Sequence, residues 1–217
     1  RLVGAIVMAH GDDNGLVLPP RLAPIQVVIV PIWKGTDPVE KILAAAKDVE
    51  ATLKRAGVAV KLDARDNLSP GFKFNEWEML GVPLRIELGP KDLEKGSVCC
   101  VKRLNRAKSF VSVADVATAV PKLLDELQAE LLAAARARLA AATFAIDGYD
   151  AFKEKLESAG GGFMLAHWCG DTACETAIHD ETKATIRVIT FDGPAEPGAC
   201  VRCVKPSMRR VHFAKAY

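Results

Sequence analysis

Apolar residues along this chain change repeatedly between the alternation typical of strands and the three-to-four-residue spacing typical of helices. Gln26 to Trp33 is almost continuously apolar, as expected of a strand covered on both faces. Residues 37–57 have helical spacing, with Asp37 as the expected N-cap. The inward face of that helix should hold Ile42, Ala46, Val49 and Leu53.

Further strands are predicted over residues 58–64, 83–89, 97–104 and 110–116. Together these elements predict an α/β fold, in which a mixed sheet of about five strands has helices packed against it.

The first residues form two short apolar runs around a turn. Leu2 to Met8 and Leu16 to Leu18 flank a segment of Gly, Asp and Asn, which predicts a β-hairpin. Asp12 and Asp13 suit the backbone angles of such a turn, and we do not assign them to a metal. Because the chain opens on Arg1 rather than Met, inside an apolar pattern, we expect a fragment of a longer protein.

The stretch Gly71 to Gly96 carries the densest mixture of aromatic, acidic and basic side chains. A helix over residues 72–80 would place Phe74 and Glu78 on one face, one turn apart. The following strand alternates, so Arg85 should lie on a polar face that we expect to look toward solvent. Lys91 follows at a turn, within reach of whatever lies against Arg85.

Guanine suits this set of side chains. Its Watson–Crick edge donates to a carboxylate, and its O6 and N7 accept from Arg or Lys. Unpaired bases in RNA loops are bound by the same combination of aromatic stacking and edge hydrogen bonds. The alternative interpretation is a surface helix and an amphipathic strand that share an ordinary charge pair.

Helical spacing dominates the next part of the chain and then gives way to short elements. A long Leu- and Ala-rich helix is predicted over residues 115–143, followed by a short helix over residues 149–158. Strands are expected over residues 163–168, 184–191 and 210–213, which together predict a small α+β domain.

Four cysteines in this last part have the spacing of a structural zinc site. Cys169 and Cys174 form one pair, and Cys200 and Cys203 form the other. Four thiolates close a tetrahedron and leave no position for water, so the zinc would stabilise the domain, whose sequence holds few large apolar residues. The alternatives are buried thiols without a metal, or disulfides. His167 and His179 are substitute ligands if one cysteine fails to reach.

The other two cysteines are expected to be packing residues. Cys99 and Cys100 are adjacent in a strand, so they point to opposite faces and cannot bind one ion together.

Composition places limits on the partners. With 217 residues, 50% of them hydrophobic, and a formal net charge of +2, the chain suits a globular protein without indiscriminate polyanion binding. Any nucleic-acid site must therefore be a local patch. No apolar run reaches the roughly twenty residues that span a bilayer, so we expect a cytoplasmic setting and no membrane partner.

Three motifs carry a family resemblance: HGDDNGLVLPPRLAP, GVPLRIELGPKDLEKG and the closing HFAKAY. With them, nearly the whole chain resembles the C-terminal part of prolyl-tRNA synthetases of the archaeal and eukaryotic type. The resemblance implies four parts: residues 1–22 end a class II catalytic domain, 23–120 form an anticodon-binding domain, 121–148 form a connecting helix, and 149–217 form a zinc-binding domain.

The same resemblance implies an activity and its partners. Such enzymes activate proline with ATP and Mg²⁺, transfer it to tRNA(Pro), whose anticodons end in two guanines, and form homodimers. Arg1 matches an arginine that contacts ATP, and no catalytic residue is assigned in this chain. The anticodon contacts fall on Phe74, Glu78, Arg85, Lys91 and Lys108, the last through a one-residue length difference.

Two rival interpretations differ in class. One is a stand-alone RNA-binding or scaffold module without catalysis, which Arg1 and the class II hairpin disfavour. The other is a threonyl or glycyl synthetase, which would lack the cysteine-bearing tail.

Overall fold

The computed structural model describes residues 1–158, 161–193 and 195–215. The last two residues of the HFAKAY motif, Ala216 and Tyr217, lie outside the described residues. The chain divides into two compact units, Arg1–Ala133 and Ala134–Tyr217. None of the described helices combines the length and apolar composition that crossing a membrane requires.

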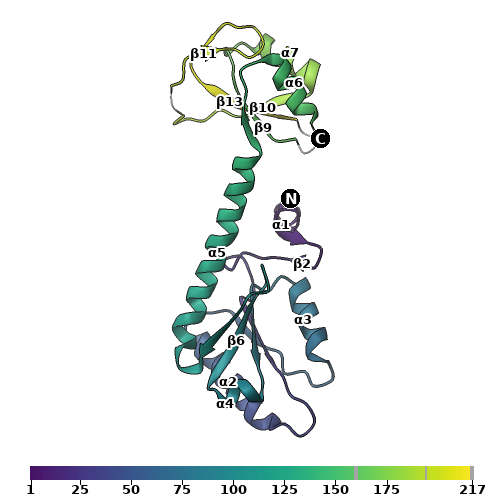
Figure 1. The fold of residues 1–217 in the computed structure, drawn as a ribbon, viewed down its shortest axis with the longest axis vertical. Helices are drawn as coiled ribbons and strands as arrows, with labels where there is room; N and C mark the ends of the chain where they lie inside the picture. Colours follow the sequence, from purple (N-terminus) through teal and green to yellow (C-terminus); the bar gives the residue numbers. More distant parts are fainter. Residues whose placement is uncertain (159–160, 194, 216–217) are drawn as a thin grey trace. The chain divides into compact units, whose positions relative to one another are not determined.

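The first unit contains a five-stranded mixed sheet and the helices that cover it (Figure 1). Its strands are β3 (Val27–Pro31), β4 (Val60–Leu62), β5 (Leu84–Leu88), β6 (Ser97–Lys102) and β7 (Lys108–Ser112). Its helices are α2 (Val39–Arg55), α3 (Pro70–Met79), α4 (Pro90–Glu94), the 3₁₀ turn η1 (Val113–Asp115) and α5 (Val116–Ala141), which continues into the second unit.

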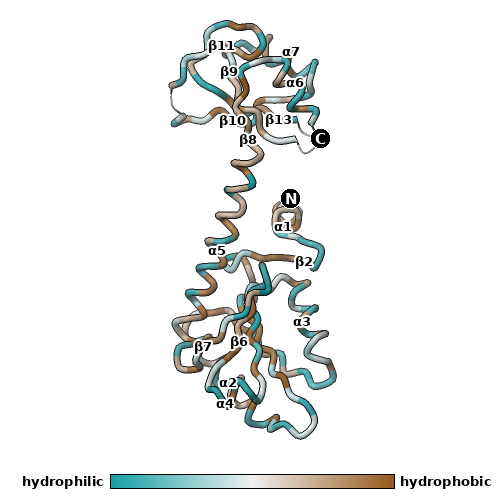
Figure 2. Tube along the Cα trace, viewed as in Figure 1, coloured by the Kyte–Doolittle hydropathy of each residue, from teal (hydrophilic) through white to brown (hydrophobic). Residues whose placement is uncertain are grey.

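The strand order β4-β3-β5-β6-β7 confirms the predicted mixed sheet. Strands β4, β3 and β5 are parallel, whereas β6 pairs antiparallel with β5 and β7 pairs antiparallel with β6. One face packs against α2 and α5, and the predicted stripe on α2 is fully buried there. The other face packs against α3 through Val28, Val30 and Trp77. The centre of the sheet is accordingly the most hydrophobic part of this unit (Figure 2).

The first apolar run is helical, so the predicted strand over residues 2–8 is wrong. Helix α1 spans Leu2–His10, and the hairpin is limited to β1 (Gly11–Asp12) and β2 (Gly15–Leu16). Helix α1 carries apolar residues on every face, and none of its residues is buried. Such a run lacks the alternation that would favour a strand, so the local helical preference of Leu, Ala and Met prevails.

Asp37 does not cap α2 as predicted. Its side-chain Oδ2 accepts a hydrogen bond from the backbone N–H of Lys34 at 2.7 Å, and the helix begins two residues later, at Val39. The carboxylate therefore closes the preceding turn, a competing use that Asp side chains commonly adopt.

The second unit contains a four-stranded sheet with the order β10-β13-β9-β8. Its strands are β8 (Thr143–Ala145), β9 (Phe163–His167), β10 (Ala184–Val188) and β13 (Arg210–Lys215), with a small β11 (Gly198–Ala199) and β12 (Pro206–Ser207) hairpin beside them. Its helices are the predicted α6 (Tyr149–Glu157) and the unpredicted α7 (Thr172–Thr182).

The second unit has a larger apolar core than its sequence indicated. Phe152 of α6 meets Phe213 of β13 edge-to-face, with 5.3 Å between ring centroids. Met164 and Ile178 are also fully buried in this cluster. The expectation of few large apolar residues therefore underestimated the core of this unit.

Candidate nucleic-acid interface and metal site

Helix α3 positions the first candidate residues. Ser69 caps it, since its hydroxyl accepts from the backbone N–H of Phe72 at 3.3 Å, and Pro70 occupies the first turn. Trp77 is buried against the sheet, which fixes the rotation of the helix. Phe74 and Glu78, one turn apart as predicted, lie partly buried beside it.

Arg85 on β5 joins both of these side chains. Its guanidinium carbon lies 4.0 Å from the centroid of the Phe74 ring. Its Nη1 donates to Glu78 Oε1 at 3.1 Å, and its Nη2 donates to Glu87 Oε1 at 2.9 Å. The structure thus brings together an aromatic ring, a guanidinium and a carboxylate that the sequence had placed on two separate elements.

The polar face of β5 does not look toward open solvent, which corrects the prediction of a half-buried strand. The side chains of Arg85, Glu78 and Glu87 are only 11%, 12% and 10% exposed. Helix α3 covers this face of the sheet, so the charged groups must satisfy one another.

The turn and strand after β6 complete the group with two exposed cations. Arg106 Nη2 donates to Glu78 Oε2 at 2.9 Å, and Lys108 Nζ donates to Glu87 Oε2 at 3.3 Å. Their side chains are 58% and 57% exposed. We call Glu78, Arg85, Glu87, Arg106 and Lys108 the ionic network. Sequence reasoning missed Glu87 as a site residue and Arg106 altogether, because a loop residue gives no periodic signal.

Lys91 lies apart from these contacts. It is exposed in α4, beyond the carboxyl end of β5, and lines a hollow with Trp33, Lys34 and Asp37. Of the predicted binding residues, four are therefore brought together and Lys91 belongs to a neighbouring surface.

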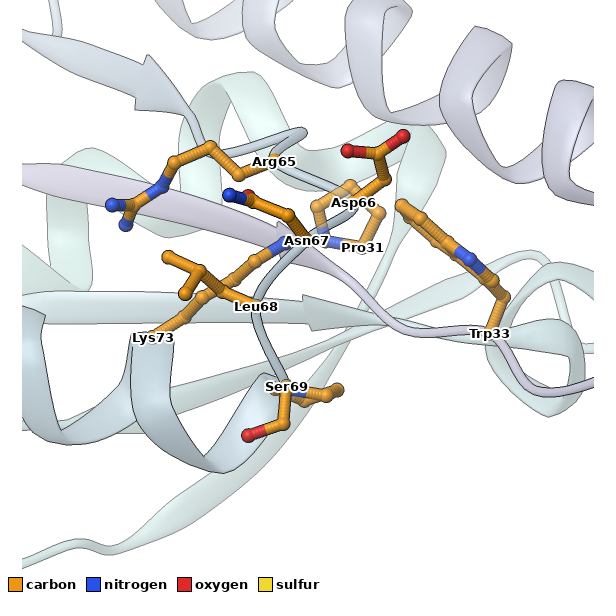
Figure 3. Close-up of a pocket in the computed structure, with 9 residues that line it drawn as sticks. Pro31, Trp33, Arg65, Asp66, Asn67, Leu68, Ser69 and Lys73 are labelled. Atoms are coloured by element: carbon orange, nitrogen blue, oxygen red, sulfur yellow. The ribbon is translucent and has the colours of Figure 1, made fainter.

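A second hollow, of about 270 Å³, lies where β3 ends and α3 begins (Figure 3). The Trp33 ring forms one side, and the guanidinium of Arg65 is directed away from that ring. Lys73 is only 2% exposed, and its Nζ donates to the Asp63 carbonyl at 3.3 Å. Burial lowers the pKa of Lys73 despite the nearby Asp63 carboxylate.

Asp63 is the centre of the contacts beneath this hollow. Its carboxylate accepts two hydrogen bonds from Arg65, at 2.8 and 2.6 Å, and one from Trp77 Nε1 at 2.8 Å. Burial opposes its ionisation, but these donors lower the pKa of Asp63 to about 2. Arg65 also pairs with Glu76, so this cluster ties β4 to α3.

The four predicted cysteines converge in the second unit. All four sulfur atoms lie within 4.8 Å of one another. Cys174 Sγ is 3.6 Å from Cys200 Sγ, and Cys203 Sγ is 3.6 Å from Cys169 Sγ. A zinc ion with bonds of about 2.3 Å requires sulfur separations of about 3.8 Å, so this donor set fits a tetrahedral metal.

Backbone groups favour a thiolate within this cluster. Burial opposes ionisation of Cys200, but the N–H groups of Cys203, Arg202 and Cys169 lower its pKa to about 7. Burial raises the pKa of the Cys174 thiol and of the Cys169 thiol. A divalent cation would supply the charge that these thiols need in order to ionise.

The two histidines stay outside the cysteine cluster. His167 is buried, and its Nδ1 lies 3.3 Å from the hydroxyl of Ser207. His179 is exposed at the end of α7, beside Asp180. Both thus have ordinary packing or surface positions. Arg1 is exposed and precedes α1. Among the described residues, none near Arg1 indicates which ligand it would bind.

Two family profiles match the chain. The family described as "Anticodon binding domain" matches residues 26–123, which include the sheet of the first unit. The family described as "Prolyl-tRNA synthetase, C-terminal" matches residues 149–217, which include the four cysteines.

Similar proteins share the whole length of this chain. The proline--tRNA ligases of Bacteroides fragilis and Cytophaga hutchinsonii are 47% and 48% identical over 100% of it. A crystal structure of the Cryptosporidium parvum prolyl-tRNA synthetase with L-proline and AMP has a TM-score of 0.91 and 38% identity, covering 99% of this chain and 46% of its own. The chain spans 44% of the length of either curated relative.

Proposed function

The chain belongs to the prolyl-tRNA synthetase family, and from that premise we propose that its first unit reads the anticodon of a proline tRNA. The complete enzyme would activate proline with ATP and Mg²⁺ and transfer it to tRNA(Pro). The observation that carries the proposal is the contact of Phe74, Glu78 and Arg85 across α3 and β5.

This arrangement has the chemistry to recognise guanine. Ionised Glu78 only accepts hydrogen bonds, and each of its oxygens has a second lone pair beyond the one that Arg85 or Arg106 uses. The N1–H and N2–H groups of guanine can donate to these acceptors, whereas adenine presents an acceptor at N1. Phe74 and the Arg85 guanidinium offer flat surfaces for stacking.

Lysines at the edge of this surface would hold the RNA backbone. Lys108 and Lys91 are exposed, and Lys108 keeps donors free beyond its contact with Glu87. Their role would be electrostatic and independent of sequence. Arg106 is a further cation on the same surface. The family resemblance does not include it among the anticodon contacts.

In the second unit, Cys169, Cys174, Cys200 and Cys203 would hold one structural zinc. Bound there, the ion would join the segment around α7 to the segment after β11 and leave no position for water or substrate. Its contribution would be to the stability of the unit and not to the chemistry of the reaction.

The remaining assignments rest on the family. Arg1 would contact ATP, and the complete enzyme would act as a cytoplasmic homodimer. The relatives extend well beyond this chain, so the catalytic residues are expected in the additional part.

Binding to anticodon stem-loops tests the proposal. Glu78→Gln should lower the preference for guanine over adenine at one of the two anticodon guanines by about 1–3 kcal/mol, because one bidentate base contact is lost. The measurement is fluorescence anisotropy with stem-loops that carry guanine or adenine at each position.

A matched control is Glu50→Gln, which also breaks a glutamate ion pair of this unit, with Lys54 on α2. It should leave the preference unchanged. Equal weakening of every RNA by Glu78→Gln would refute the base-reading role.

A further inference from the structure

The β1–β2 hairpin lies in close backbone contact with the end of α3. A Cβ atom on Gly15 would lie 2.4 Å from Met79 Cα, and one on Gly81 would lie 2.5 Å from Leu16 Cβ. Leu18 N–H also donates to the Gly81 carbonyl at 3.3 Å. Because both glycines have positive φ angles, of 123° and 77°, no other residue type fits this approach without strain. The hairpin is therefore a fixed neighbour of Glu78.

Arg103 joins the hairpin to Glu78. Its side chain is only 3% exposed. Its Nη1 and Nη2 donate to the two carboxylate oxygens of Asp12 at 3.0 and 2.7 Å, and its Nε donates to the Glu78 backbone carbonyl at 2.9 Å. One guanidinium thus holds the hairpin turn and the helix end at the same time.

Arg106 makes a parallel connection at the side chain of Glu78. The same Nη2 that donates to Glu78 Oε2 at 2.9 Å donates to Asn14 Oδ1 at 3.2 Å. Asp12 and Asn14 are themselves joined, since the Asn14 N–H donates to Asp12 Oδ1 at 2.8 Å. Two residues of one turn therefore hold two of the three arginines that contact Glu78, and the third is Arg85.

We propose that Arg103 is a positioning residue for anticodon reading, and that Asp12 of the hairpin holds it in place. Arg103 is too buried to touch a base and acts through Glu78. Glu78 lies next to Met79, the last residue of α3, where helices lose backbone hydrogen bonds and fray. The Arg103–Asp12 pair fixes this helix end, so that the Glu78 carboxylate meets a guanine edge in the correct position. This inference rests on the proposed function.

The hairpin therefore takes part in base recognition without contacting RNA. The hairpin follows α1 in the chain. Hydrogen bonds from Arg103 and Arg106 therefore connect the segment that begins at Arg1 with Glu78. A displacement of the hairpin would move Glu78.

A double-mutant cycle with stem-loop RNA tests the inference. Asp12→Ala should reduce the guanine-over-adenine preference about 5-fold to 10-fold at the position that Glu78 reads, while the salt dependence of binding stays the same. Asp12→Asn keeps an acceptor for Arg103 and should restore most of the preference. In a Glu78→Gln background, Asp12→Ala should cause no further loss of preference, because both changes act through one carboxylate.

Asp13→Ala is the matched control, since Asp13 lies exposed in the same turn. It should leave the preference unchanged. Arg103→Met keeps the side-chain volume but removes every hydrogen-bond donor. It should reduce the guanine-over-adenine preference as much as Asp12→Ala does.

Two outcomes would overturn the inference and leave the proposed function intact. In the first, Glu78→Gln abolishes the preference but Asp12→Ala and Arg103→Met both retain it. In the second, Asp12→Ala lowers the preference equally with and without Glu78→Gln. If Glu78→Gln itself leaves the preference intact, the proposed function fails, and the inference fails with it.

Discussion

The ionic network of the first unit and the cysteine cluster of the second unit gather polar groups in opposite ways. The ionic network joins side chains from α3, β5 and the residues after β6, which satisfy one another's charges directly. The cysteine cluster brings together four thiols of one kind, which are arranged so that they could hold a metal ion. One site is complete in the polypeptide, whereas the other has the donor set to hold an ion.

This difference affects how each site responds to change. An ion pair that is partly buried depends on its neighbours and on pH, and removing one partner leaves a charge uncompensated. A four-thiolate site depends on metal supply, and losing one ligand opens the coordination shell. The two units should therefore fail under different treatments.

The largest expected effect is on the metal. Cys200→Ser should reduce bound zinc well below one per chain and destabilise the second unit, since a structural zinc supplies on the order of 10 kcal/mol of binding free energy. The apolar core around Phe152 and Phe213 should keep the unit partly ordered. Elemental mass spectrometry and thermal melting with and without a chelator measure both effects.

Cys99→Ser is the matched control, because Cys99 is buried on β6 of the first unit and is not one of the four clustered cysteines. It should keep one zinc per chain. Wild-type protein without zinc, and with a melt unchanged by chelator, would show that the cysteines are packed thiols.

A smaller effect, on pH dependence, separates the first unit from the second. The folded-state pKa of Asp63 is about 2, below the usual value of 3.8. A lowered pKa contributes stability above the unfolded-state value, and this stability is lost as the pH falls toward 2. The loss should be about 2 kcal/mol between pH 5 and pH 2.

Asp63→Asn should therefore differ most from wild type at neutral pH and least near pH 2. Tryptophan fluorescence in a Trp168→Phe background reports this unit, since Trp33 and Trp77 remain. Asp48→Asn, an exposed change on α2, should follow the wild-type curve. A constant difference across this pH range would contradict the role of Asp63.

The smallest expected effect concerns single exposed charges. Lys91→Ala should lower the salt dependence of RNA binding by about 0.7 in the logarithmic slope, the value for one phosphate contact with a single strand. Lys108→Ala should lower it less, because Glu87 already neutralises part of its charge. Binding measured over a salt series decides this, with Lys54→Ala on α2 as the control. Unchanged slopes for Lys91→Ala and Lys108→Ala would place both lysines outside the interface.

Regular spacing explains which features could be predicted from the sequence. The buried stripe of α2, the five strands of the sheet and helix α6 follow from periodic apolar positions, which depend on local geometry. The gathering of the four cysteines was also predictable, because the short spacing within each pair is typical of cysteines that bind one zinc ion. The division of the chain into four parts remains a prediction.

The sequence by itself determined that a mixed sheet, a helix bearing Phe74 and Glu78, and a four-cysteine cluster would form. Only the tertiary structure decided that α3 covers the polar face of β5 and that Asp12 meets Arg103. Asp12 and Arg103 are 91 residues apart, and no periodic pattern connects them. Their contact depends on how the hairpin packs against the end of α3, and this packing is a property of the whole first unit.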